Sequence, residues 1–239
     1  MLVGFIGDLH GRVFHALAAV LTWQRIHYRR FDLLIQVGDL GAITRLDQLD
    51  PESDPHLTAD AAEADLARFL VAAGRLADLI SHLKGELSTP IHFIRGNHED
   101  FPWLANLPID PRNRVAPADP FGVFQYVPDG TVLTVGDGCI AFLGGVEEEA
   151  GDAHFDERAY HSLLQLGPGA VDLLVTHEGP YGSSVGYRGD THGSPLISDL
   201  VDALRPSFHV AGHAHQVSGP RKFGSTCYLG LDGIVASPR

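Results

Sequence analysis

The stretch Leu2-Val3-Gly4-Phe5-Ile6-Gly7-Asp8-Leu9-His10-Gly11 joins a short apolar run to two side chains that can bind a metal. The run predicts a β-strand, and Asp8 and His10 stand two positions apart at its end. Alternate residues of an extended chain point to the same face, so both side chains can reach one ion. Strand ends are rigid and the loops after them face solvent, so ligands placed there are both held and reachable.

Four further stretches repeat this pattern. The apolar runs are Leu33 to Val37, Ile91 to Ile94, Val171 to Val175 and Phe208 to Ala211, followed by Gly38-Asp39, Gly96-Asn97-His98-Glu99, Thr176-His177 and Gly212-His213-Ala214-His215. Together the five patches supply two Asp, one Asn and four His, plus one further His at position 98. That is more than one cation needs, and it suits two cations that share a bridging carboxylate. Two metal ions close together are a common device for attack on phosphorus.

The order Asp-x-His, Gly-Asp, Gly-Asn-His-Glu, His, Gly-His-x-His resembles the signature of the calcineurin-like metallophosphoesterases. The resemblance runs from residue 8 to residue 215 and so covers most of the chain. It implies two divalent ions (Mn, Fe or Zn) with Asp39 as the bridging carboxylate. It assigns Asp8, His10 and His215 to the first ion, and Asn97, His177 and His213 to the second.

His98 is the further histidine, which the family places beside the metals and not on them. The resemblance therefore implies that hydroxide formed from a shared water attacks the phosphorus in line, while His98 protonates the leaving alkoxide or stabilises phosphoryl charge. Glu99 or Asp100 could orient this imidazole. Arg12 and Arg95 are candidate phosphate-binding residues, because a guanidinium matches phosphate oxygens bidentately; the alternative for each is an ordinary surface arginine.

The rest of the chain predicts an α/β (α+β) protein. One helix follows Gly11, and a second starts near Asp60 and continues past Leu83, with Asp60 and Glu63 as a capping-box pair. Three β-rich runs, 123–127, 131–135 and 139–143, are separated by two turn sequences that predict antiparallel hairpins. A third helix begins at Ser194-Pro195 and ends before Pro206, among further strands at 208–211, 225–231 and 234–236. This order agrees with the family's four-layer αββα sandwich of two mixed sheets flanked by helices, formed by residues 1–239 as a single domain.

Two polar stretches fall outside these elements. Residues 47–60 are acidic, contain proline, and are interpreted as a surface loop. Residues 179–193 begin two positions after His177 and carry Tyr181, Tyr187 and Arg188, so they are interpreted as a substrate-facing loop. Tyr187 and Arg188 are accordingly candidate substrate-binding residues, able to stack a base or bind a phosphate. The sequence leaves open whether either loop gates the site.

Composition narrows the class of substrate. The chain has 239 residues and a formal net charge of −13, which disfavours long-range attraction of nucleic acid. Its two cysteines have no paired spacing, and neither a signal peptide nor a membrane-spanning apolar run is recognised, so a cytoplasmic location is expected.

The second patch separates branches of the family. Protein Ser/Thr phosphatases have Gly-Asp-x-x-Asp-Arg-Gly there, whereas this chain has Gly38-Asp39-Leu40-Gly41-Ala42, without the phosphate-binding arginine. A fainter similarity to lariat RNA-debranching enzymes includes Gly193-Ser194-Pro195 before a helix, although many of those enzymes carry Cys at the place of Asp8. The leading prediction is hydrolysis of a phosphate mono- or diester of a small molecule or nucleotide. The alternatives are an RNA or DNA phosphodiesterase of nuclease or debranching type, and a non-catalytic interaction module on the same fold.

Overall fold

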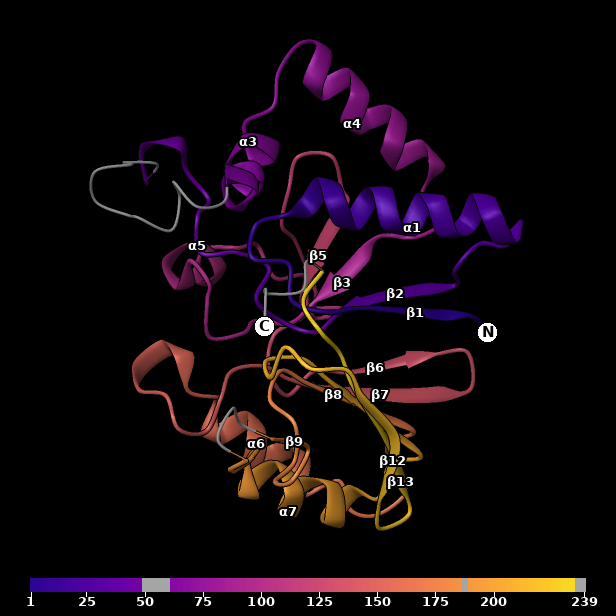
Figure 1. Cartoon of the computed structure of the whole chain (residues 1–239), viewed down its shortest axis with the longest axis vertical. Coiled ribbons are helices and arrows are strands. Elements are labelled where there is room, and N and C mark those ends of the chain that lie inside the picture. The colour runs from indigo at the N-terminus through magenta and orange to yellow at the C-terminus, as the bar shows by residue number, and fades with distance from the viewer. Residues whose placement is uncertain (49–60, 186–188, 235–239) are drawn as a thin grey trace.

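Two β-sheets pack face to face in the computed structural model, which describes residues 1–48, 61–185 and 189–234 (Figure 1). The first sheet has the order β1-β2-β3-β5-β4. Its strands are β1 (Val3–Ile6), β2 (Leu33–Gln36), β3 (Ile91–Phe93), β5 (Phe124–Tyr126) and β4 (Ala116–Pro117). The first four run parallel, and the short β4 is antiparallel to β5. Helices make the crossovers that parallel neighbours require.

Those helices cover the outer face of the first sheet. They are α1 (Val13–His27) between β1 and β2, and α3 (Asp65–Leu70) and α4 (Arg75–Glu86) between β2 and β3, with α5 (Phe101–Ala105) after β3. Two 3₁₀ turns, Leu46–Gln48 and Ala61–Ala64, lie within the second crossover.

The second sheet has the order β12-β13-β11-β8-β7-β6. Its strands are β6 (Val132–Val135), β7 (Gly138–Leu143), β8 (Leu173–Thr176), β11 (Phe208–Ala211), β12 (Ser218–Phe223) and β13 (Thr226–Gly230). The four central strands are parallel, and the edge strands β6 and β12 are antiparallel to their neighbours. The helices α6 (Glu157–Leu164) and α7 (Pro195–Leu204) cover its outer face, after the 3₁₀ turn Gly151–Ala153. A separate two-stranded ribbon joins β9 (Ser184–Val185) and β10 (Thr191–His192).

Three hydrophobic cores separate four layers. Leu17, Phe69 and Phe93 belong to the core between the first sheet and its helices. Ile35 and Val175 belong to the core between the two sheets. A third core, under α6 and α7, contains Tyr160, Leu174 and Leu200. Neighbouring residues such as Leu34 and Ile35 fall in different cores, as expected of a strand buried on both faces. The predicted αββα sandwich of two mixed sheets is therefore confirmed.

The prediction of one continuous second helix is wrong, because the structure has two separate helices in this region. Asp60 lies outside the described residues, and the chain forms a 3₁₀ turn before α3 begins at Asp65. The chain then leaves the helical conformation, and Gly74 has a φ of 56° immediately before α4. A left-handed residue cannot continue a right-handed helix, so the periodic stripe is divided between two helices.

The turn at 128–130 is not the predicted hairpin. β5 pairs parallel to β3 in the first sheet, whereas β6 lies in the second, so these residues carry the chain from one sheet to the other. The β6–β7 hairpin and the start of α7 are confirmed, and the Ser194 hydroxyl accepts a hydrogen bond from the Ile197 N–H. Ile234 is not in a strand, and residues 235 and 236 lie outside the described part of the chain. The sequence did not predict α5, α6, β12 or the β9–β10 ribbon.

Candidate metal centre

The five predicted patches follow the carboxyl ends of parallel strands in both sheets. Asp8 follows β1, Asp39 follows β2 and Asn97 follows β3, while His177 and the 213–215 loop follow β8 and β11. Carboxyl ends of parallel strands meet at one edge of a sheet, so face-to-face packing of the two sheets brings these loops together. The site therefore lies where both sheets end, and each half contributes to it.

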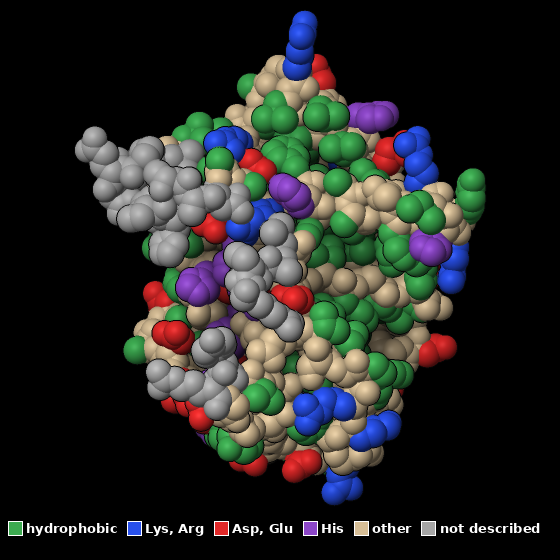
Figure 2. Space-filling model, viewed as in Figure 1, with side chains coloured by type: hydrophobic (Ala, Val, Ile, Leu, Met, Phe, Trp, Pro, Cys, Tyr) green, Lys and Arg blue, Asp and Glu red, His purple; other side chains and the backbone are tan. Residues whose placement is uncertain are grey.

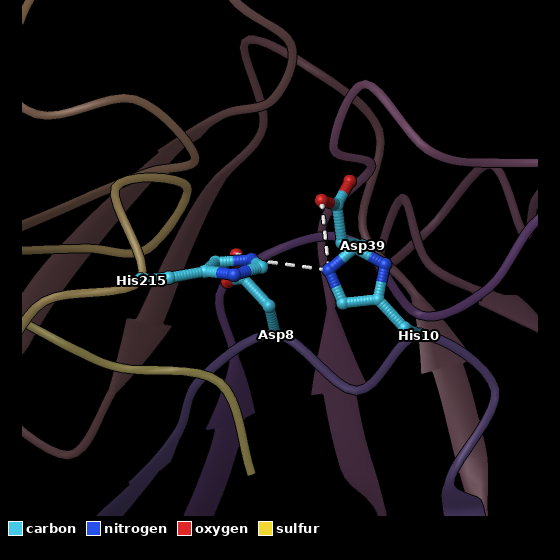
Figure 3. Close-up of side chains that lie close together, drawn as sticks. All are labelled: Asp8, His10, Asp39 and His215. Carbon is cyan, nitrogen blue, oxygen red and sulfur yellow. Dashed lines mark hydrogen bonds and ion pairs between the residues drawn. The ribbon is translucent and has the colours of Figure 1, made fainter. Parts of the chain in front are cut away.

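A first cluster contains Asp8, His10, Asp39 and His215, whose potential ligand atoms all lie within 4.8 Å of one another (Figure 3). The Nε2 atoms of His10 and His215 are 3.1 Å apart. His215 Nε2 is 3.0 Å from Asp8 Oδ2, and His10 Nε2 is 3.6 Å from Asp39 Oδ2. Two imidazole nitrogens and two carboxylates that converge in this way could hold a divalent metal ion.

A second cluster lies on the other side of Asp39. The Asn97 Oδ1 atom is 3.0 Å from His177 Nε2 and 3.1 Å from His213 Nδ1. His177 Nε2 is also 3.4 Å from Asp39 Oδ1. The two oxygens of Asp39 thus face different clusters, Oδ1 towards His177 and Oδ2 towards His10. This is the geometry expected of a carboxylate shared by two cations.

One buried oxygen in the site has no hydrogen-bond partner among the described residues. Asp8 Oδ1 is buried without a hydrogen bond, although the Oδ2 atom of the same side chain accepts one from the His213 N–H at 3.0 Å. An unsatisfied buried carboxylate oxygen is costly. A cation beside it would remove that cost, so the donor set fits a metal ion better than it fits a purely structural role.

The backbone is unusual at the same residues. Seven non-glycine residues have positive φ among those described, and four of them belong to the two clusters. These four are His10 (45°), Asp39 (56°), His213 (64°) and His215 (47°). Left-handed conformations cost free energy for residues with a Cβ, and they concentrate at functional sites. The backbone conformation of these loops therefore places the four side chains in the clusters, at the cost of departing from the φ values that the residues prefer.

Glycine permits the closest approaches. A Cβ at Gly96 would lie 2.0 Å from Asp39 Oδ1, and a Cβ at Gly212 would lie 2.2 Å from Asp8 Oδ1. Neither carboxylate could keep its place if these residues had side chains. The small residues that accompany the ligands in the sequence thus have a steric explanation.

Hydrogen bonds from neighbouring groups orient the donors. His177 Nδ1 lies 2.8 Å from the Val37 carbonyl, which makes that nitrogen the donor and leaves Nε2 free to face the cluster. The His98 N–H donates to Asp39 Oδ1 at 2.8 Å. The carboxylate of Glu99 accepts from the N–H groups of Leu40, Gly41 and Gly96, at 2.9, 3.1 and 3.0 Å respectively. Glu99 therefore fixes the Asp39 loop to the Asn97 loop.

The electrostatics divide the four imidazoles of the site into two pairs, one favoured as neutral and one that attracts protons. Burial lowers the pKa of His213 to about 4, and burial also lowers the pKa of His10. Burial opposes the charged form of His177 too, but the nearby Asp39 and Asp8 outweigh it and raise the pKa. The hydrogen bond to Asp8 raises the pKa of His215. Neutral imidazole is the form that binds a metal, and cations would replace the protons that His177 and His215 attract.

His98 lies at the mouth of the site. Its side chain is exposed, and its ring centroid is 5.5 Å from that of His10. Within the described part of the chain, neither predicted partner orients its ring. The Glu99 carboxylate is occupied by backbone N–H groups, and Asp100 caps α5 through the Trp103 N–H and accepts from the Thr44 hydroxyl. The expectation that one of these carboxylates orients His98 is therefore wrong.

Arg95 is buried, and its guanidinium is already bound by other groups. Its guanidinium forms a buried ion pair with Asp129 at 2.6 Å and donates to the carbonyls of Asp152 and His154. The prediction that Arg95 binds phosphate is corrected, because these partners already use its donors. The residue instead ties the end of β3 to the crossover between the sheets.

Arg12 remains near the site. It pairs with Glu63 at 3.3 Å, and its guanidinium lies 3.5 Å from the His10 carbonyl. Its role in phosphate binding stays a prediction. Tyr187 and Arg188 lie outside the described residues, as does most of the predicted 47–60 loop. The described ends of the 179–193 loop form the β9–β10 ribbon, which lies beside His213.

The sequence did not predict that residues 232–234 border the first cluster. The Ile234 N–H donates to the Asp8 carbonyl at 3.0 Å, and the Asp232 carbonyl would lie 1.9 Å from a Cβ at Gly7. This segment follows β13, another parallel strand of the second sheet. An apolar run followed by Leu231-Asp232-Gly233 is the same signal that identified the other five loops.

Comparison with known proteins agrees with this geometry. A family model described as calcineurin-like phosphoesterase matches residues 1–217. The chain belongs to this family. No curated protein matches it in a sequence search. Membership supports metal-dependent phosphoester hydrolysis as the class of activity, with the four residues of the first cluster as a possible metal-binding site.

Solved structures support the fold. The crystal structure of TT1561 of Thermus thermophilus is similar with a TM-score of 0.57 at 12% identity, covering 97% of this chain and 89% of that one. A second crystal structure is similar with a TM-score of 0.56 at 13% identity, covering 97% and 90%. At such low identity the similarity concerns the fold alone. No helix in the described ranges is long and apolar enough to cross a membrane.

Proposed function

We propose that this calcineurin-like phosphoesterase hydrolyses a small phosphate mono- or diester with two divalent cations, Mn, Fe or Zn, in the paired clusters. The observation that carries the proposal is the placement of Asp39, whose two oxygens face His10 and His177 in separate clusters. Asp8, His10 and His215 would complete the first site, and Asn97, His177 and His213 the second. Two such ions would supply positive charge that polarises phosphoryl oxygens and makes a water acidic enough to act as a nucleophile.

The side chains of the protein have separate tasks in this proposal. Asp39 holds the two halves of the site at a fixed separation, and the His98 N–H and the Glu99 carboxylate hold Asp39 and its loop. His98 itself lies at the exposed mouth, where its imidazole can give a proton to a departing alkoxide. Neither Glu99 nor Asp100 fixes this imidazole among the described residues, because both carboxylates bind other groups.

A small substrate agrees best with the charge of the molecule. The net charge of −13 repels polyanions, so nucleic acid is an unfavourable partner. With Arg95 committed to Asp129, phosphate recognition falls to the cations and to Arg12. These observations favour a phosphate ester of a small molecule over RNA or DNA, and no membrane partner is proposed.

The test is hydrolysis by metal-free and metal-loaded protein. Nitrophenyl phosphate and bis(nitrophenyl) phosphate report monoesterase and diesterase activity, and a branched RNA tests the nuclease alternative. We expect turnover of at least one chromogenic ester after loading with Mn, Fe or Zn, and its loss on chelation. Asp39→Asn should be inactive, whereas Asp137→Asn, which changes an exposed Asp in the β6–β7 turn, should match the wild type. Absence of turnover with every metal would refute the proposal and favour the non-catalytic alternative.

A further inference from the structure

A cavity adjoins the proposed metal centre on the side of the second cluster. Its volume is about 420 Å³, and its walls include His213, the β9–β10 ribbon and the segment after β7. Since His213 belongs to both the cavity and the second cluster, a phosphate held at the metals would extend a substituent directly into this space. The volume is within the range of small-molecule sites.

The ribbon that forms one wall is fastened to the metal loop. Gln216 directly follows His215, and its side-chain amide pairs with the backbone of β9, Nε2 to the Val185 carbonyl at 2.9 Å and Oε1 to the Val185 N–H at 3.4 Å. The Ser218 hydroxyl donates to the Ser183 carbonyl at 2.8 Å, which anchors the start of the same ribbon. These hydrogen bonds connect the cavity wall directly to the loop that carries the proposed ligands.

Three glutamates line the described walls of the cavity. Glu178 directly follows His177 and is only 8% exposed; its Oε2 accepts from the Glu147 N–H at 2.8 Å, while its Oε1 has no partner among the described residues. Glu148 and Glu149 line the cavity and likewise have no ion pair or hydrogen bond there, whereas Glu147 is bound to Ser194 at the start of α7. No Lys or Arg lines the cavity in the ranges described. Figure 2 shows acidic side chains gathered on the left of the lower half, beside the histidines.

We infer that this cavity is the specificity pocket of the proposed phosphoesterase and that it takes an alcohol substituent bearing an amino group. A cationic substituent would supply donors to Glu148, Glu149 and the free oxygen of Glu178, whereas a substituent with its own carboxylate or phosphate would be repelled. The inference rests on the proposed function for the location of the phosphate. It narrows that function from phosphate esters in general to aminoalkyl esters.

Binding of two matched, non-hydrolysable phosphonates tests the pocket separately from catalysis. Calorimetry with Mn-loaded protein should give a lower Kd for 2-aminoethylphosphonate than for 3-phosphonopropionate, which carries a carboxylate in place of the amine. In the Glu148→Gln, Glu149→Gln double variant this preference should fall by roughly three- to tenfold, because exposed charge pairs each contribute a modest amount. A control variant, Glu86→Gln with Glu157→Gln, removes the same charge from exposed positions outside the cavity and should keep the preference.

Each outcome decides one of the two proposals. An unchanged preference in the Glu148 and Glu149 variant, or an equal fall in both variants, would overturn the pocket assignment while leaving phosphoesterase activity intact. If the phosphonates bind with the expected preference but neither ethanolamine phosphate nor any nitrophenyl ester is hydrolysed, the proposed function fails while the cavity still binds the amine. If nitrophenyl phosphate is hydrolysed but ethanolamine phosphate and its nitrophenyl diester are not, the proposed function stands and the specificity assignment is overturned.

Discussion

Replacement of Asp39 by Asn should remove one cation selectively, and the hydrogen bonds of the site indicate which one. The His98 N–H donates to Asp39 Oδ1 at 2.8 Å, so the amide oxygen of the variant must take that position to keep the bond. The amide NH₂ then takes the place of Oδ2, which faces His10 at 3.6 Å. An NH₂ group cannot bind a metal, so the first cluster loses a ligand while the second keeps an oxygen.

The loss of affinity at the first cluster follows from the lost charge, whereas the second ion keeps its oxygen ligand and no longer faces repulsion from the first ion. At an effective dielectric constant of about 20, a unit charge about 4 Å away contributes roughly 4 kcal/mol, or about a 10³-fold change in Kd. Titration of the apo protein with Mn²⁺ by calorimetry should therefore show one strong equivalent in place of two, with turnover abolished. Adding His213→Ala should remove the remaining ion, whereas adding His215→Ala should spare it. Two strong equivalents in the single variant, or the opposite pattern in the double variants, would refute the bridging role.

The remaining predictions concern the catalytic step and stability. His98→Ala should keep both ions but lose about 10²- to 10⁴-fold in kcat with an alkyl ester, and less with nitrophenolate as leaving group, because only the alkoxide needs a proton; equal losses would indicate charge stabilisation instead. Arg95→Ala should lower the free energy of unfolding in urea by about 3–5 kcal/mol, because Asp129 is left buried and unpaired. Arg45→Ala, which breaks the exposed pair with Asp47, should cost at most about 1 kcal/mol; similar losses in both would contradict the structural role of Arg95. Burial lowers the pKa of His209 to about 3, below its ordinary value of 6.5, so its stabilising contribution is complete above about pH 6.5 and is lost as the pH falls towards 3, at about 1.4 kcal/mol per pH unit. His209→Leu should flatten that part of the stability profile, and an unchanged slope would show that other groups cause it.

The strands that carry the site residues are predicted well from the sequence, and there is a physical reason for this. β2 and β8 are fully buried, β3 and β11 are mostly buried, and β1 is half-buried. Each therefore reads as a short apolar run that ends where a small residue and a ligand begin. The approach of the ligands across the two sheets was predictable only through the family resemblance. Distances between Asp39 and residues more than a hundred positions away depend on how the sheets pack.

Other features depend on partners that are remote in sequence. In the sequence, Arg95 stands near Asn97 and has no evident carboxylate partner. In the folded protein, the crossover between the sheets places the Asp129 carboxylate beside its guanidinium. The turn at 128–130 has hairpin residues, but tertiary pairing places its two flanking strands in different sheets. Glu99 is adjacent to His98 in the chain, yet its carboxylate accepts hydrogen bonds from two N–H groups of the Asp39 loop and from one N–H group of its own loop. Local patterns cannot report such competition between partners.

The most direct test of a paired metal site is a titration of chelator-treated protein with Mn²⁺, in which bound metal and hydrolysis of a chromogenic phosphate ester are measured on the same samples. We expect two equivalents to bind per chain and turnover to rise with the second equivalent, because each cluster contributes to one reaction centre joined by Asp39. Saturation at a single equivalent with full turnover, or turnover that does not depend on metal, would contradict the account.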